Sequence, residues 1–273
     1  MIAANVFEKR IRTAFGPPSD PEVPATSSSD ATRGLQLKDR VAAIRRIVSG
    51  RVVFTTSFGI EDQAIAHAIF SQGLSIDVVA LDTGRLFPET FELWARTEHR
   101  YGRRIVAAYP DRAGLEPLVA HRGINGFYAS VEARHACCAV RKAEPLRRAL
   151  AGAVAWITGV RGDQSDARVA ASFAIVAPRH RLIKVNPLFD WSRDQVVAFI
   201  REHDIPYHSL HDRGFATIGC APCTRAVAPG EPERSGRWWW EQEQTLEREL
   251  HDCPGPQAPA SPPPTSSSQE ATP

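Results

Sequence analysis

Short apolar runs typical of buried strands alternate with longer segments of helical periodicity through most of this chain. The expected strands are Val52–Thr56, Ile76–Leu81, Ile105–Tyr109 and Val154–Thr158. The expected helices are Leu35–Val48, Ala64–Phe70, Pro88–Tyr101, Ala139–Leu150 and Ser192–His203, the last with Ser192 as its N-cap. This alternation predicts an α/β fold, with a mostly parallel sheet covered by helices on both faces and ligands bound beyond the carboxyl ends of the strands.

The two ends of the chain differ from its middle in composition. Residues 16–34, with their Pro, Ser, Thr and Asp, and residues 254–273, still richer in Pro, Ser and Ala, hold little that could be buried, so disordered ends are expected over 1–34 and 254–273. Residues 35–253 then form one domain. Residues 173–180 have a loop-like composition, and we expect them to fold over a ligand as a lid.

Charge and hydropathy restrict the partners. A net charge of +2 without a basic block argues against nucleic acid. No window approaches the roughly 18 consecutive apolar residues of a membrane span, and Met1–Arg12 lacks the apolar centre of a signal peptide. A cytoplasmic location is therefore expected.

Ser57–Asp62 lies directly between an expected strand and the helix after it. Free backbone N–H groups and the helix dipole make such a junction a ready anion site, and Gly59 allows the backbone to approach a ligand closely. Ser57 and Asp62 therefore become candidate binding residues. An ordinary turn capped by Ser57 is the plain alternative.

Two further loops follow strands and should meet Ser57–Asp62 at the same edge of the sheet. The first is Leu81-Asp82-Thr83-Gly84, whose backbone at Leu81 and Thr83 could reach a base or ribose, although the sequence is also common in turns. The second, Gly159–Ser165 with Arg168 beyond it, offers flexible backbone at Gly159 and the guanidinium groups of Arg161 and Arg168 for a phosphate or sulfate. A solvated loop is its alternative.

Four of the five cysteines stand in two tight pairs, Cys137-Cys138 and Cys220-x-x-Cys223. Such pairs suit a metal centre in a reducing compartment better than a disulfide framework. Vicinal cysteines reach separate corners of an iron–sulfur cubane more easily than those of one zinc ion, so an iron–sulfur cluster is favoured over zinc and over reduced structural thiols. Lys142 follows Cys138 by one helical turn and would place a cation beside the cluster, with a solvated helix lysine as the alternative.

Several motifs, taken together, resemble the assimilatory adenylyl-sulfate reductases, the iron–sulfur branch of the phosphoadenylyl-sulfate (PAPS) reductase family, over about residues 35–251. They are SFGIED from Ser57, LDTGRLFPET from Leu81, CCAVRKAEPLRRAL from Cys137, GVRGDQS from Gly159 and LHDRGFATIGCAPCTRAVAPGEPERSGRWWWE from Leu210. The resemblance implies an adenine nucleotide α-hydrolase-like fold.

The resemblance also implies an activity. Adenylyl sulfate would be reduced to sulfite and AMP through a cysteine thiosulfonate on a mobile C-terminal segment, with thioredoxin or a similar dithiol as reductant. A [4Fe-4S] cluster that positions and polarises the substrate without shuttling electrons would be held by Cys137, Cys138, Cys220 and Cys223. Cations near the sulfate would be Lys142, Arg168, Arg234, Arg237 and His251, while backbone at Leu81 and Gly159 would meet adenine. Solvated surface positions are the alternative for Arg234, Arg237 and His251.

One departure from the family pattern affects the nucleophile. The usual T-K-E-C-G-L-H segment corresponds to Thr245–His251, and its cysteine position is Arg248. Arginine cannot act as a sulfur nucleophile or exchange with a dithiol. Our hypothesis is that Cys253 replaces the missing cysteine, although nothing nearby lowers its pKa clearly and an unreactive tail thiol is the alternative. Gly162 also stands where the family commonly has a second arginine.

Two other functions compete with reduction. Arg248 favours a catalytically impaired iron–sulfur protein that binds nucleotide or assists another reductase. An ATP pyrophosphatase fits less well, because the S-G-G-x-D-S loop of those enzymes is absent and Phe58 and Glu61 stand in its place. The sequence leaves open whether the chain forms a homo-oligomer.

Overall fold

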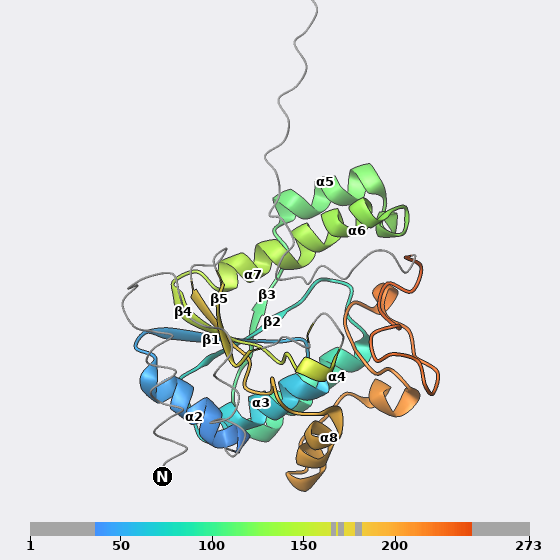
Figure 1. The fold of residues 1–273 in the computed structure, drawn as a ribbon. Helices are drawn as coiled ribbons and strands as arrows, with labels where there is room; N and C mark the ends of the chain where they lie inside the picture. The colour runs from blue at the N-terminus through green and yellow to red at the C-terminus, as the bar shows by residue number, and fades with distance from the viewer. Residues whose placement is uncertain (1–35, 165–167, 169–171, 178–181, 242–273) are drawn as a thin grey trace, which may run out of the picture.

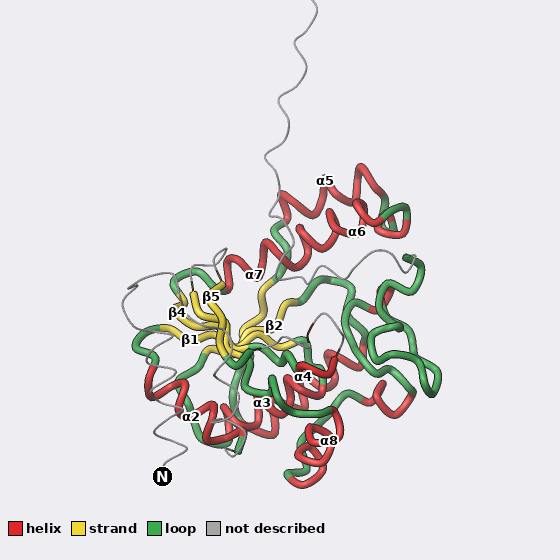
Figure 2. The backbone as a smooth tube through the Cα atoms, viewed as in Figure 1, coloured by secondary structure: helices red, strands yellow, loops and turns green. Residues whose placement is uncertain are grey.

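A single mixed sheet organises the part of the chain that the structure describes. The structure is a computed structural model that describes residues 36–164, 168, 172–177 and 182–241. In this part six strands form the sheet in the order β3-β2-β1-β4-β6-β5 (Figures 1 and 2). The strands are β1 Arg51–Thr56, β2 Asp77–Leu81, β3 Val106–Ala108, β4 Ala153–Ile157, β5 Ala174–Ala177 and β6 Leu182–Val185. All pairings are parallel except that of β5 with β6, which confirms the predicted mostly parallel sheet.

The chain order of the strands reverses next to β1. From β1 the chain proceeds outward through β2 and β3, and then returns to add β4 on the opposite side of β1. Loops after two such neighbouring strands diverge and leave a crevice beyond their carboxyl ends. The topology therefore predicts a ligand site where β1 and β4 end.

Helices cover both faces of the sheet, as predicted. On one face lie α2 Leu37–Ile47, α3 Ile60–Phe70, α4 Pro88–Tyr101 and α8 Arg193–Glu202 (Figure 1). On the other face lie α7 Glu144–Ala149, which contacts β2 and β3, and, further out, α5 Arg112–Arg122 and α6 Val131–Cys138. Short helical turns are η1 Gly126–Tyr128, η3 Gly162–Gln164, η5 Ser209–Arg213 and η6 Ala221–Cys223. None of the described helices is long and apolar enough to cross a membrane.

Alternate residues of the central strands face different layers of core. Val52 and Phe54 of β1 pack in the cluster formed with α2, α3 and α8, whereas Val53 packs with Trp156 and with Leu146 of α7. Residues 60–69 of α3 are all buried. Because α3 is covered on every side, its first turn and the loop before it are held firmly at the mouth of the crevice.

The helix around the cysteine pair differs from the sequence prediction. A helix was expected to begin after Cys138, at Ala139, but helical structure already starts at Val131, where Ser130 accepts a hydrogen bond from the Ala133 N–H at 3.1 Å. It continues through a π-helical turn, η2 Ala139–Ala143, into α7. Such turns carry one extra residue and frequently occur at functional sites. Here the turn lies between Cys138 and α7 and contains Lys142.

The expected lid over residues 173–180 is corrected by the structure. Ala174–Ala177 form the edge strand β5, and Phe173 is buried against Phe189 with ring centroids 6.0 Å apart. Hydrogen bonding to β6 favours the strand here, a long-range effect that local composition does not reveal. Residues 178–180 and the two expected disordered ends lie outside the described residues.

Candidate active site

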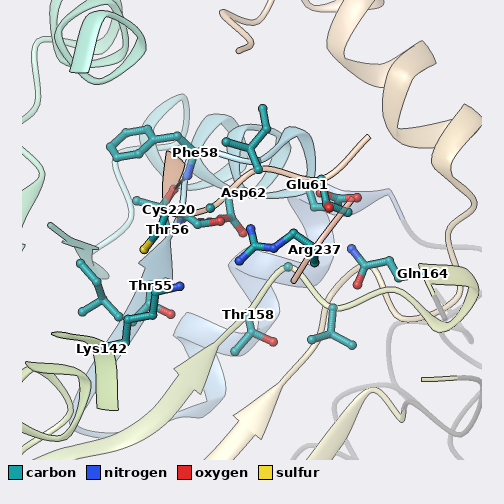
Figure 3. Close-up of a pocket in the computed structure, with 18 of the residues that line it drawn as sticks. Thr55, Thr56, Phe58, Glu61, Asp62, Lys142, Thr158, Gln164, Cys220 and Arg237 are labelled. Carbon is teal, nitrogen blue, oxygen red and sulfur yellow. Dashed lines mark hydrogen bonds between the residues drawn. The ribbon is translucent and has the colours of Figure 1, made fainter. Parts of the chain in front are cut away.

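A cavity of about 230 Å³ opens at the carboxyl ends of β1, β2 and β4. The sequence-predicted residues that line it are Ser57, Gly59, Asp62, Leu81, Thr83, Lys142, Gly159, Arg168, Cys220, Arg234 and Arg237. Figure 3 shows Lys142 and Cys220, from the two cysteine segments, around the same hollow as Asp62 and Thr158 from the strand edge. The fold therefore brings the loops after three strands together with the cysteine segments.

The loop after β1 is closed by Asp62. One oxygen of this carboxyl group accepts hydrogen bonds from the Ser57 N–H at 2.6 Å and from the Ser57 hydroxyl at 2.9 Å. Gly59, the N-cap of α3, supplies no side chain to the free N–H groups of the first turn. A Cβ atom at Gly159 would overlap the Asp62 carboxyl group, so glycine is needed for the loop after β4 to come this close. The junction retains N–H donors for an anion.

Arg161 lies behind the cavity wall and is not among the residues that line it. Its side chain is fully buried and donates to Glu61 at 2.8 Å and to Glu233 at 2.9 Å, and it also pairs with Asp163. Glu61 belongs to α3, Asp163 to the loop after β4, and Glu233 to the segment just before Arg234. In this position Arg161 ties the anion loop to the segment that carries Arg234.

Thr83 connects the strand edge with the second cysteine pair. Its hydroxyl oxygen lies 3.2 Å from the sulfur of Cys220, and its backbone carbonyl accepts a hydrogen bond from Arg141 at 2.7 Å. Arg141 belongs to the π turn after Cys138. Thr83 is therefore bound both to the helix with the first cysteine pair and to the turn with the second.

The four cysteines of the two pairs gather at one end of the cavity. Cys220 and Cys223 are buried in a small cluster with Phe127 and Trp238, and Cys137 packs against this cluster. All four are free thiols, of which Cys138, Cys220 and Cys223 are buried and Cys137 is half-buried. Burial raises the pKa of Cys137, and Cys138 and, from the other segment, Cys220 add to the rise, as thiols that lie near one another do.

Burial and neighbouring charges shift the pKa values of the thiols in opposite directions. Burial raises the pKa of Cys223 to about 12, with Cys220 adding to the rise. Burial also opposes ionisation of Cys220, yet the Lys142 ammonium, the Thr83 hydroxyl and Arg237 together hold the pKa of Cys220 below its usual value. Lys142 thus touches the thiol site and lines the cavity at once.

Arg237 brings a buried guanidinium group to the same centre. Among the described residues its buried Nε atom has no hydrogen-bond partner. Burial lowers the pKa of Arg237, whereas the thiols Cys220, Cys223 and Cys138 favour its charged form. A Cβ atom at Gly219 would overlap this guanidinium group, so glycine before Cys220 gives the arginine its place. Buried charges are normally paired, and this one points to an anionic occupant.

The donor set fits an iron–sulfur cluster. Beside the thiols, the buried indole N–H groups of Trp238 and Trp240 also have no hydrogen-bond partner in the described part of the chain, and such donors suit a centre with negative charge. In the described part of the chain, no three His, Cys, Asp or Glu side chains are grouped closely enough to hold one metal ion. The four free thiols from two segments are nevertheless the donor type that a [4Fe-4S] cluster takes.

Three of the predicted residues lie outside the described part of the chain, and several residues of the cavity wall were not predicted from the sequence. Arg248, His251 and Cys253 lie outside the described residues, so their predicted roles stay predictions. The cavity is also lined by Trp156, Gln164, His211, Thr217 and Trp238, which the sequence analysis did not single out. Gln164, His211, Thr217 and Trp238 stand in motifs quoted above without a role of their own, whereas Trp156 lies in a strand and no motif marks it.

A cavity beyond the carboxyl ends of the strands, at the point where their order reverses, is typical of ligand-binding α/β proteins with an open sheet, and the sheet agrees with the predicted adenine nucleotide α-hydrolase-like fold. Residues 51–226 match the model of the phosphoadenosine phosphosulfate reductase domain. The chain therefore belongs to this family of sulfonucleotide reductases, as its motifs predicted.

Individual relatives agree with this assignment. An adenosine 5'-phosphosulfate reductase of Agrobacterium fabrum strain C58 is 51% identical over 86% of this chain and 90% of its own length. Another, of Rhizobium meliloti strain 1021, is 52% identical over 82% of this chain and 84% of its own length. The crystal structure of PAPS reductase from Candida auris in a phosphate complex superimposes with a TM-score of 0.64 at 24% identity, covering 78% of this chain and 100% of that one, which supports the fold.

Proposed function

We propose that this chain reduces adenylyl sulfate to sulfite and AMP in sulfate assimilation, with a thioredoxin-type dithiol as reductant. The observation that carries the proposal is the position of Cys220 and Lys142, which belong both to the four-thiol centre and to the nucleotide cavity. Relatives about half identical to this chain are adenosine 5'-phosphosulfate reductases.

The cavity offers separate places for the two ends of such a substrate. Backbone at Leu81 and Gly159 would meet the adenine, and the N–H groups of the loop after β1 would meet the phosphoryl group. The cations Lys142, Arg168, Arg234 and Arg237 line the same cavity and would surround the sulfate. They would reduce the repulsion between an anionic sulfuryl group and an incoming thiolate.

The chemistry proceeds by two displacements at sulfur. A cysteine thiolate attacks the sulfur of the sulfate, an S–S bond forms, and the S–O bond breaks so that AMP leaves with the electron pair. A thiolate of the dithiol then attacks the cysteine sulfur of this thiosulfonate, and sulfite departs with the electron pair of the S–S bond. The second thiol of the dithiol completes the reduction by releasing the cysteine. We assign the nucleophile to Cys253, with His251 near the sulfate.

A [4Fe-4S] cluster would be held by Cys137, Cys138, Cys220 and Cys223. When bound, it would supply a local electrostatic field that helps to position and polarise the substrate. Lys142, which acts on the Cys220 thiol and lines the cavity, would link this centre to the sulfate.

Sulfite formation tests the activity. The purified protein, with thioredoxin, thioredoxin reductase and NADPH, should release sulfite from adenylyl sulfate. We expect its kcat/KM for adenylyl sulfate to exceed that for phosphoadenylyl sulfate by at least about a hundredfold, because the proposed site offers no complementary group for the additional phosphate. A preference for phosphoadenylyl sulfate would contradict the proposed substrate.

Arg248 favours one alternative, a catalytically impaired iron–sulfur protein that binds the nucleotide without reducing it. Such a protein would bind AMP and carry the cluster, yet it would produce no sulfite with any dithiol. Binding and turnover measured on the same preparation separate the two functions.

The pH dependence of binding should follow Asp62. Burial raises the pKa of Asp62 to about 7, the hydrogen bonds from Ser57 oppose this rise, and Glu61 adds to it. An acid with a raised pKa is neutral below that pH and anionic above it, so an anionic ligand loses affinity as the pH rises through about 7, by up to about tenfold per unit. Asp62→Asn keeps an oxygen that can accept hydrogen bonds from Ser57, and it should make the affinity nearly independent of pH in this range.

Calorimetric titration with adenylyl sulfate, in the Cys253→Ser background to prevent turnover, measures this effect from about one pH unit below to about two units above the Asp62 pKa of about 7. Parallel curves with and without the Asp62→Asn substitution would show that another group governs the dependence.

A further inference from the structure

A buried ion pair fastens the segment 237–241 to helix α6. Both carboxylate oxygens of Glu241 accept hydrogen bonds from Arg134, and the distance between Nη2 and Oε2 is 2.9 Å. The two side chains are only 4% and 9% exposed. A bidentate pair with this burial is geometrically specific, and removal of one partner leaves the other charge buried and unpaired.

The pair lies against the thiol centre. The Arg134 guanidinium group is 4.4 Å from the centre of the Trp238 ring, and Cys138 is one of the groups that raise the pKa of Arg134. Phe127, Trp238 and Trp240, which we call the aromatic cover, pack around Cys220 and Cys223. Arg134 and Glu241 therefore connect the helix of the first cysteine pair to the cover over the second.

The same segment also forms part of the cavity wall. Arg237 and Trp238 line the cavity, and the Trp238 N–H donates to the Cys223 carbonyl at 3.3 Å. The Glu241 N–H donates to the Trp238 carbonyl at 2.9 Å. Arg237, Trp238 and Trp240 of this five-residue segment thus contact the cavity or the cysteine cluster, and the ion pair fixes the end of the segment at Glu241.

We propose that Arg134 and Glu241 form a latch that holds residues 237–241 in place and thereby couples the thiol centre to the nucleotide cavity. Loss of one latch partner leaves a buried charge, which the protein relieves by letting this segment open. Opening uncovers the thiols and withdraws Arg237 and Trp238 from the cavity wall. The two residues are positioning residues, and the inference relies on the proposed function only for its choice of ligand.

The test compares Glu241→Gln, Arg134→Gln and the double variant. Arg148→Gln is the matched control, because it removes an exposed pair with Glu144 from the same helical run. Protein purified without oxygen is alkylated, and the rate at each of the four cysteines is followed by peptide mass spectrometry. AMP affinity is measured by calorimetry on the same samples.

Each single substitution should accelerate alkylation at the four cysteines and weaken AMP binding by about tenfold or more. The double variant should be no worse than the more affected single variant, since the partners act as one unit. Neither readout requires sulfite production, so a protein without reductase activity still tests the latch.

Two results would overturn the latch. Glu241→Gln could match Arg148→Gln in both readouts, or Arg134→Gln alone could change them, in which case Arg134 acts through its own charge on the thiols. If Glu241→Gln does not fold, as judged by circular dichroism, Glu241→Asp keeps the charge but shortens the reach, and the same comparison applies.

Discussion

Replacing Cys220 by serine is expected to remove the iron–sulfur chromophore and lower sulfite production by at least about a hundredfold. Cys220 is the thiol whose pKa is held low by Lys142 and Thr83, so it is the sulfur best prepared to bind as a thiolate. Serine keeps the hydrogen bond with Thr83 possible but offers a hard oxygen where iron prefers sulfur. Iron content and visible absorption of anaerobically purified protein measure the loss.

The matched control is Cys253→Ser, which removes the cysteine outside the two pairs and should leave the colour intact. Full iron and colour in Cys220→Ser would contradict the assignment of this residue to the cluster. A colourless wild-type protein that contains zinc would contradict the cluster itself, while leaving the four-thiol site in place.

Replacing Lys142 by alanine is expected to lower kcat/KM for adenylyl sulfate by about 10²–10³-fold, the usual cost of removing one group that stabilises developing charge. Lys142 lies beside the Cys220 sulfur and lines the cavity, so its ammonium group can face the sulfate. AMP has no sulfate, and its affinity should therefore change little. Steady-state kinetics and AMP calorimetry together measure both effects.

Arg147→Ala is the control for this substitution, because Arg147 is 70% exposed in the same helical run. Equal losses for AMP and adenylyl sulfate in Lys142→Ala would show that the lysine shapes the cavity as a whole instead of acting on the sulfate.

Local patterns were sufficient for the central layers of the fold. Apolar strands such as Val52–Thr56 and a well-capped helix such as α8, where Ser192 and Gln195 form a capping box, are stabilised by features that lie within a few residues. The sequence did not predict α5, whose interior contains Pro117 and which has no fully buried residue. An amphipathic pattern is weak in such a helix, because its packing does not demand one.

The site shows the same division between local and long-range effects. Loops after strands must meet at one sheet edge, so Ser57, Leu81 and Gly159 were predictable from order alone. The burial of Arg161 was not, because its partner Glu233 lies 72 residues away in sequence. Arg134 and Glu241 are 107 residues apart and were missed for the same reason.

The intact mass of the protein after incubation with adenylyl sulfate, without reductant, tests the central claim most directly. We predict one sulfite adduct per chain, located on Cys253 by peptide mapping, released by thioredoxin and absent from Cys253→Ser. An unmodified wild-type protein that nevertheless binds AMP, or an adduct that persists in Cys253→Ser, would contradict this account.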